Sequence, residues 1–205
     1  MTNALALAAF ILPCAVIALL FFTRVQAVFA SAVVAGVLAT IAGILHVVAD
    51  VPIAVLWLFL VGLTLALLAS LSSLRSRVIQ NARTAVSRQE YIQLAAATAL
   101  VLFVVTLVPA PLAWDARSIW LFHASWLNSP AQAFLDGQSL VAIDWSHPNY
   151  PILGPASMAV TWGFAGGSEN LILGVQVIAL LTILVISLAA SLAIRTFAAT
   201  GNTWV

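Results

Sequence analysis

The chain has few charged residues and no lysine. Only 6% of its 205 residues are charged, and all seven cationic side chains are arginines. An ordinary soluble domain carries about 25% charged residues. A soluble fold of this size leaves much of its surface in water, and a chain that is 64% hydrophobic cannot supply that surface. The shortage of charge excludes an ordinary soluble domain and indicates that lipid is the solvent.

Other absences exclude further classes of protein. The net charge is +1 and the arginines form no basic stripe, so the sequence indicates no nucleic-acid partner. Cys14 is the single cysteine, so no internal disulfide can form, and we expect a buried, inert thiol. Paired cysteines, an HExxH motif, two histidines at ligand spacing, a serine-nucleophile signature and a phosphate-binding loop are all missing. The sequence therefore predicts no metal site and names no cofactor.

Long apolar runs are what the sequence has instead. A helix needs about 20 apolar residues to cross about 30 Å of hydrocarbon. The fifth of six candidate runs is the weakest, because it is short and contains several prolines and glycines. We predict an all-α fold, a polytopic transmembrane helix bundle with about six spans. The predicted spans cover residues 4–22, 26–49, 52–72, 92–113, 151–166 and 171–195.

The arginines predict how the bundle is oriented. Four of the seven lie within residues 75–88, between the third and fourth spans, and Arg24 falls on the same side by alternation. The positive-inside rule places this side in the cytoplasm. We therefore expect an integral protein of the plasma or inner membrane, with residues 114–150 on the external face. Arg195 weakens the count, because alternation places it outside if both late spans cross fully.

Most of the polar and aromatic side chains lie in the segment 114–150. It holds three of the six carboxylates, two of the three histidines and four of the seven tryptophans. Tryptophans favour the membrane interface, and we interpret these as an interfacial belt. We predict short juxtamembrane helices in this external loop, one beginning at Ala116 and another after Ser129 and Pro130.

Several polar residues near this segment also have a purely structural interpretation. His123 falls on an apolar helix face, where packing is commoner than ligation. Asp136 precedes a glycine and is expected to end a helix in solvent, and Glu169 is expected to lie in a solvated turn. Asp115 is also placed to cap the helix that begins at Ala116.

Two short motifs frame the segment. Residues 114–117 (WDAR) directly follow the fourth predicted span, and residues 144–151 (DWSHPNYP) directly precede the fifth. This arrangement resembles the first external loop of polytopic glycosyltransferases of the GT-C superfamily, such as protein mannosyltransferases and aminoarabinose transferases. In that family an acidic residue follows a transmembrane helix, and a Pro-Pro-Leu-Tyr or His-Pro-x-Tyr-Pro motif opens the next one. The resemblance covers roughly residues 92–197.

The resemblance implies a function and a division of the chain. Residues 1–91 would form three N-terminal transmembrane helices and a cytoplasmic loop, an addition that the family's core fold does not require. Residues 92–205 would form the start of a catalytic module. The implied reaction moves a sugar from a polyprenyl-phosphate donor to an unknown acceptor hydroxyl on the external face. Family members usually have many more spans, so further transmembrane helices outside this chain are expected partners.

The resemblance also assigns roles to five residues. Asp115 matches the acidic residue and would be the catalytic base, because partial desolvation raises the pKa of a carboxylate and makes it a better proton acceptor. Arg117 would stabilise the departing lipid phosphate, although an arginine here can equally snorkel to lipid headgroups. Asp144, His147 and Tyr150 would bind substrate.

Two other functions are compatible with the composition. A transporter for a lipid-like substrate would need ionisable groups near the middle of the bilayer, whereas this chain keeps its charges at the ends of its spans. A non-catalytic membrane scaffold or assembly subunit is compatible with the short chain. The glycosyltransferase is the predicted function.

Overall fold

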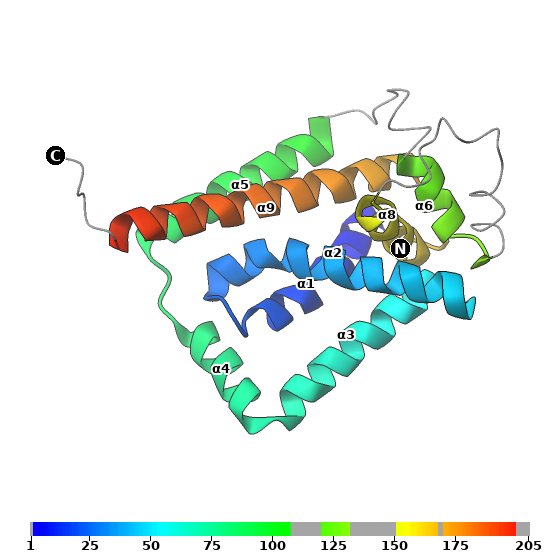
Figure 1. Cartoon of the computed structure of the whole chain (residues 1–205). Helices are drawn as coiled ribbons and strands as arrows, with labels where there is room; N and C mark the ends of the chain where they lie inside the picture. Colours follow the sequence, from blue (N-terminus) through cyan, green and yellow to red (C-terminus); the bar gives the residue numbers. More distant parts are fainter. Residues whose placement is uncertain (1, 108–119, 132–150, 168–169, 200–205) are drawn as a thin grey trace.

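The structure is a computed structural model of the whole chain (Figure 1). Every regular element in the described part of the chain is a helix, and no strand occurs there. The all-α prediction is therefore confirmed over these residues. The structure describes residues 2–107, 120–131, 151–167 and 170–199.

Three of the described helices are long and apolar enough to cross a membrane, so the protein is membrane-embedded. They are α2 (Arg24–Ala49), α3 (Ile53–Ser70) and α9 (Leu171–Ala199). Each lies where an apolar run of the sequence predicts a span.

Helices also occupy the other three predicted spans, but none of them belongs to this long, apolar group. α1 (Asn3–Ala18) has 16 residues and α8 (Leu153–Phe164) has 12. α5 (Arg88–Leu107) has 20 residues, with a polar first turn. The described helices therefore establish three candidate spans rather than the expected six.

Two short helices complete the described structure. α4 (Ser72–Arg83) lies in the predicted cytoplasmic loop, where no helix was predicted, and none of its residues is buried. α6 (Phe122–Leu127) confirms part of the first predicted juxtamembrane helix, whose expected start at Ala116 lies outside the described residues.

α2 is the centre of the bundle and packs against α1, α3, α8 and α9 (Figure 1). Its buried face is made of small residues that recur at helical spacing, and small residues let membrane helices approach closely. A Cβ atom added at Gly36 would lie 3.4 Å from Leu153, and one added at Gly43 would lie 3.4 Å from the Cβ of Ala156. α8 therefore packs on this face of small residues on α2. The small residues of this face are Ala32, Ala35, Gly36, Ala39, Ala42 and Gly43.

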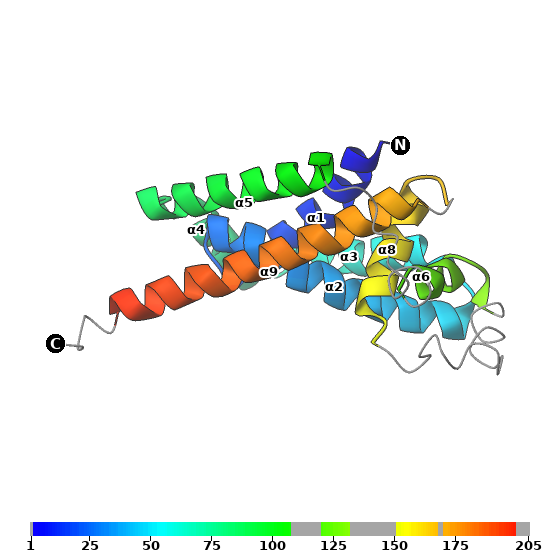
Figure 2. The ribbon, with the colours of Figure 1, turned by 90° about the horizontal axis from the view of Figure 1, so that it is seen from above.

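α8 does not cross the bundle from end to end. Its 12 residues span about 18 Å, well short of the ~30 Å of a bilayer core. Figure 1 shows it nearly end-on, while α2 and α9 run across the view, and Figure 2 shows it lying across them. It begins against Gly36, near the middle of α2, and ends with Gly163 against Ala54, at the start of α3. α8 therefore covers only part of the bundle's length, from the middle of α2 to the start of α3, and does not establish residues 151–166 as a full span.

All six described arginines lie at one end of the bundle. Arg24 donates a hydrogen bond to the carbonyl of Ala82 at the end of α4, and Arg195 forms an ion pair with Glu90 at the start of α5. α4 also lies at this end in both Figure 1 and Figure 2. Because Arg195 contacts Glu90 and Thr23, it lies with the other described arginines, and the conflict in the charge count disappears. We call this the arginine end, and it holds Arg24, Arg75, Arg77, Arg83, Arg88 and Arg195.

A buried carboxylate ties three parts of the chain together at the arginine end. Glu90 is 8% exposed, and it accepts hydrogen bonds from the backbone N–H (2.9 Å) and hydroxyl (3.0 Å) of Ser87. The hydroxyl of Ser87 in turn accepts the N–H of Glu90, which completes a capping box on α5. Arg195 of α9 and Thr23, between α1 and α2, bind the other carboxylate oxygen. Burial alone would raise the pKa of Glu90, but the bonds from Ser87 and Arg195 outweigh it, so the pKa is lowered.

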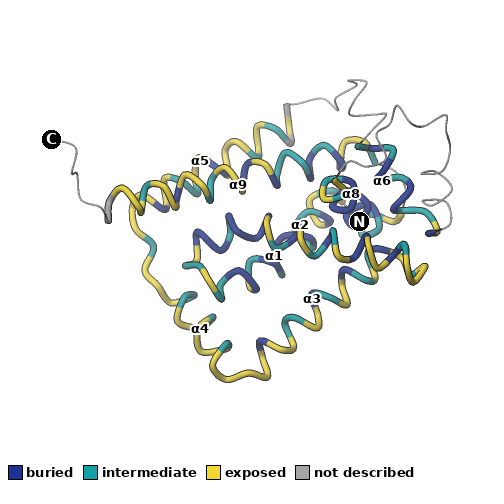
Figure 3. The backbone as a smooth tube through the Cα atoms, in the orientation of Figure 1, coloured by how far each residue is buried: buried dark blue, intermediate teal, exposed yellow. Residues whose placement is uncertain are grey.

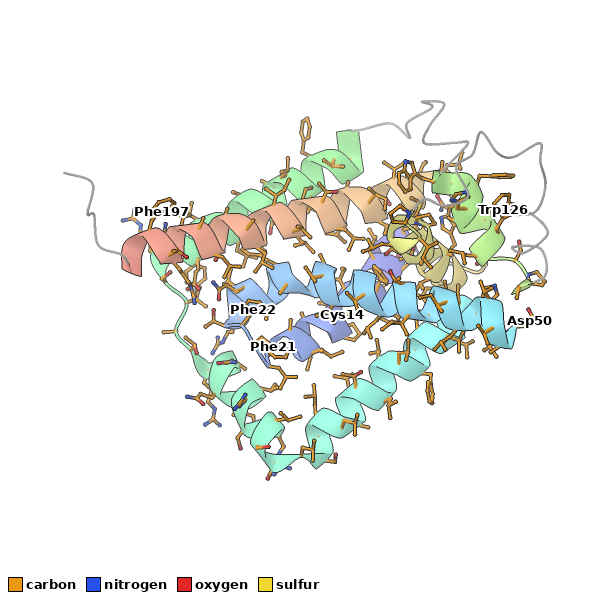
Figure 4. The ribbon with its side chains drawn as sticks, viewed as in Figure 1. Cys14, Phe21, Phe22, Asp50, Trp126 and Phe197 are labelled. Atoms are coloured by element: carbon orange, nitrogen blue, oxygen red, sulfur yellow. The ribbon has the colours of Figure 1, made fainter. Side chains whose placement is uncertain are left out.

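The outer faces of the long helices are exposed (Figure 3), and many of the residues there are large and apolar. On α3, for example, Leu58 is 54% exposed and Phe59 is 63% exposed. Such surface is compatible with lipid and not with water. The interior holds a cluster of aromatic side chains around Trp57 of α3. The ring centroid of Trp57 lies 5.4 Å from that of Phe10 of α1 and 5.4 Å from that of Phe164 of α8. Cys14 is fully buried, as expected from its apolar run (Figure 4).

Candidate functional site

The five residues to which the sequence assigns roles lie outside the described residues. The structure therefore neither confirms nor contradicts their predicted convergence. What it does describe are the stretches of chain that flank them. The five residues are Asp115, Arg117, Asp144, His147 and Tyr150.

The described residues that flank the two motifs lie against each other. Trp120 is the first described residue after the WDAR motif, and Gly154 follows the DWSHPNYP motif by three positions. A Cβ atom added at Gly154 would lie 3.8 Å from Cε3 of Trp120. Two parts of the chain that are far apart in sequence therefore meet, close to the point where Leu153 lies against Gly36 of α2. The end of the bundle away from the arginines is called the opposite end, and it contains α6 and Asp50 (Figure 4).

An apolar groove of about 480 Å³ opens where these stretches meet. It lies between α8, α9 and the residues just before α6, and among the described residues that line it only Thr182 carries a hydroxyl group. The groove is large enough for part of a small-molecule or lipid ligand, and its walls favour a hydrocarbon chain. It is lined by Trp120, Leu121, Leu153, Gly154, Met158, Val175, Ile178, Ala179, Leu181 and Thr182.

Gly174 sets the spacing of the helices beside the groove. A Cβ atom there would lie 3.0 Å from Leu121, 3.3 Å from the sulfur of Met158 and 3.3 Å from the ring of Trp162. Real Cβ atoms rarely approach other atoms so closely. The glycine therefore allows α9 to pack tightly on α8 and on the chain leading into α6.

α6 is a packed element beside this groove. His123 is 3% exposed, and its ring stacks on Trp126 with the centroids 5.3 Å apart. Phe122 packs on the same indole, with a centroid distance of 4.3 Å. Burial lowers the pKa of His123 and so favours the neutral ring. The interpretation of His123 as a packed residue is confirmed.

The turn between α8 and α9 is held by side chains from other elements. Gly166 and Gly167 adopt positive φ angles of 111° and 79°, as the polar, glycine-rich sequence indicates. Asn128, at the end of α6, donates a hydrogen bond of 2.6 Å to the carbonyl of Gly167. The side chain of Asn170 accepts the N–H of Leu173 at 2.9 Å, which caps α9. Glu169, expected in this turn, lies outside the described residues.

A second cavity, of about 290 Å³, lies at the opposite end of the bundle and was not predicted from the sequence. Its polar lining comes from His46 and Asp50, at the end of α2, and from Asn128 and Ser129, just after α6. The positive-inside rule places His46 and Asp50 on the external side, and no motif in the sequence singles them out. Their spacing of one helical turn at the end of an apolar run is the signal that could have drawn attention to them.

The described residues include no group of three or more histidine, cysteine and acidic side chains that could hold a metal ion. Comparison with family models, with curated proteins and with solved structures gives no match to this chain. What is established is the class: an all-helical, membrane-embedded protein. Its function must be argued from the residues of the chain.

Proposed function

We propose that the chain forms part or all of a GT-C-type glycosyltransferase that moves a sugar from a polyprenyl-phosphate carrier to an acceptor hydroxyl. The observation that supports this most strongly is the apolar groove beside the flanks of the two candidate motifs. A polyprenyl donor has a hydrocarbon chain and a phosphate-linked sugar, so its site must join an apolar groove to a polar, charged segment. The groove at Trp120 and Gly154 supplies the first, and residues 114–150 carry the second.

The distribution of charge supports an external location for this site. All six described arginines lie at the arginine end, so the positive-inside rule assigns that end to the cytoplasm. The groove runs from the middle of the bundle toward the other end, which then faces the exterior of a plasma or inner membrane. In this proposal α1, α2, α3, α5 and α9 each cross the bilayer, while α8 enters it only partway from the external side.

The candidate residues then have complementary roles in transfer. Asp115 accepts the proton of the acceptor hydroxyl while that oxygen attacks the anomeric carbon. The bond from the anomeric carbon to the phosphate oxygen breaks, and Arg117 stabilises the negative charge on the departing polyprenyl phosphate. Asp144, His147 and Tyr150 bind and orient the sugar.

Replacement of Asp115 by asparagine tests the proposal. Asparagine still caps a helix, so stability should change little. It cannot accept the proton, so transfer from a polyprenyl-phosphate sugar should fall by ~10²-fold or more. The assay measures transfer of radiolabelled sugar by the complete membrane protein, together with any further helices it needs.

The matched control is Asp136→Asn, which removes a carboxylate from the same segment at a position expected only to end a helix. Its turnover should stay within about twofold of the unchanged protein. Full turnover by a folded Asp115→Asn protein would remove Asp115 from the mechanism. Absence of transfer in the unchanged complete protein would favour the scaffold alternative.

A further inference from the structure

We propose that the 290 Å³ cavity at the opposite end binds a primary ammonium group. This site is separate from the apolar groove, and its argument does not depend on the glycosyltransferase proposal. The polar side chains that line it come from two segments far apart in the sequence, at the ends of α2 and α6.

One residue that lines the cavity is His46, a buried histidine whose Nε2 has no hydrogen-bond partner among the described residues. His46 is 2% exposed, and its Nδ1 lies 2.8 Å from the carbonyl oxygen of Val51. A carbonyl oxygen can only accept, so Nδ1 must carry the hydrogen. In the neutral ring Nε2 is then a hydrogen-bond acceptor, and it has no partner among the described residues. A buried polar atom without a partner costs free energy, and a bound donor would recover it.

The other polar groups of the cavity are also left with acceptor capacity. One carboxylate oxygen of Asp50 accepts the N–H of Ala131 at 2.8 Å, and no bond to the second oxygen occurs within the described residues. The side-chain amide of Asn128 donates a hydrogen bond of 2.6 Å to the carbonyl oxygen of Gly167. The side-chain Oδ1 of Asn128 then provides a further acceptor. The hydroxyl of Ser129 donates a hydrogen bond of 3.0 Å to the backbone carbonyl oxygen of Ser125. A cavity whose donors are already engaged requires a ligand that donates.

The electrostatics favour a cation over a neutral hydroxyl compound. α2, α6 and α8 all end at this cavity, and helix C-termini carry partial negative charge. α3 begins there and Ala131 beside the cavity is also helical, so helix N-termini offset part of this field and the sign of the site rests on Asp50. Asp50 adds a full negative charge. The described arginines lie at the far end of α2, about 39 Å away along its 26 residues, which is several Debye lengths at physiological salt.

The size and walls of the cavity favour an organic ammonium over a metal ion. Its volume would hold about ten water molecules at ~30 Å³ each, much more than a bare ion occupies. Pro52, Ile53 and Leu127 supply apolar walls that do not suit a hydrated ion. An ammonium group has three N–H donors and no acceptor. His46, Asp50 and Asn128 offer three acceptors, while the apolar walls suit a short carbon arm.

Two sources could present this group: a soluble amine, or the aminoethyl headgroup of a lipid at the external surface. We expect ethanolamine to bind the purified full chain saturably, as measured by calorimetry, and N-acetylethanolamine to bind at least tenfold more weakly. In nanodiscs, competition by phosphatidylethanolamine but not by phosphatidylcholine would identify the lipid as the source. Equal ethanolamine affinity in both kinds of nanodisc would identify the soluble amine.

Two variants test the residues, and a third is the matched control. Asp50→Asn removes the charge but can still accept the N–H of Ala131, and His46→Phe removes the acceptor but keeps a ring. Both should weaken ethanolamine binding at least tenfold. His123→Phe removes an equally buried imidazole with an unpartnered Nε2 that does not line this cavity, and it should bind normally. No saturable binding, equal binding of the neutral analogue, or full affinity in a folded Asp50→Asn protein would overturn the proposal.

Discussion

The two ends of the bundle use polar groups in opposite ways. At the arginine end, the buried carboxylate of Glu90 is fully engaged by Ser87, Thr23 and Arg195. At the opposite end, His46 and Asp50 keep free acceptors beside a cavity. Satisfied polar groups hold elements in place, whereas unsatisfied ones at a cavity are available for a ligand. The comparison indicates that polar groups anchor the bundle at one end, and it supports the proposed ligand site at the other.

The largest expected effect concerns the two ends of the bundle, which we expect to lie on opposite sides of the membrane. After Cys14→Ala, single cysteines at Ser76 in α4 and at Pro130 after α6 should react with a membrane-impermeant maleimide from opposite sides. Both positions are exposed, so each cysteine is accessible to the reagent. Labelling in intact and in permeabilised cells measures this. Reaction of both cysteines from the same side would end the distinction between a cytoplasmic and an external end.

The anchoring role of the arginine end is tested by breaking the ion pair from each side. Arg195→Gln leaves the buried carboxylate of Glu90 without its cation, whereas Glu90→Gln leaves Arg195, whose side chain is 46% exposed, free to reach water. A fully buried pair costs about 3–5 kcal/mol when broken, and this exposure reduces the cost to about 1–3 kcal/mol for Arg195→Gln. Glu90→Gln should cost less. Equal losses of thermal stability in detergent would contradict the asymmetry.

The same pair predicts a dependence on pH. The pKa of Glu90 is lowered in the folded protein, so the carboxylate contributes stability above its ordinary value of 4.5. That contribution is lost as the pH falls through the folded pKa. The deficit in melting temperature of Arg195→Gln should therefore be greatest near pH 7 and should narrow below about pH 4. A deficit that stays constant from pH 7 to pH 3.5 would show that Arg195 acts by packing alone.

A smaller effect tests how tightly the opposite end is packed. A Cβ atom at Gly163 would lie 2.6 Å from the Cβ of Ala54, so Gly163→Ala should cost about 1–3 kcal/mol through overpacking. Gly62, inside α3, has nothing within 4 Å of an added Cβ, and Gly62→Ala is the matched control. It should be neutral or stabilising by up to about 1 kcal/mol, because alanine favours a helix. Equal melting temperatures for the two variants would show that α8 and α3 separate readily.

The sequence predicts the helices well because apolar length is a local property. α2 and α9 coincide closely with predicted spans, since each is one uninterrupted apolar run. α4 was missed because it is polar and its residues are not buried, so it leaves no hydropathy signal. α5 begins at Arg88, earlier than predicted, because the capping box of Ser87 and Glu90 extends it into polar sequence.

The depth of a helix and the convergence of distant residues could not be predicted in the same way. Hydropathy indicates that α8 is apolar, but its transverse position depends on Gly36 and Gly43, more than a hundred residues earlier. The cavity at His46 also depends on Asn128, which belongs to another element. The predicted site around Asp115 is still a prediction, because it lies outside the described residues.

The shortness of α8 also has a consequence for the order of assembly. A segment of 12 residues is too short to be held across a bilayer alone, and Pro155–Trp162 of α8 is entirely buried by neighbours. One of those neighbours, α2, is synthesised earlier, but α9 is synthesised afterwards. α8 is therefore completely covered only after α9 has been inserted, and we expect it to reach its final packing at that stage.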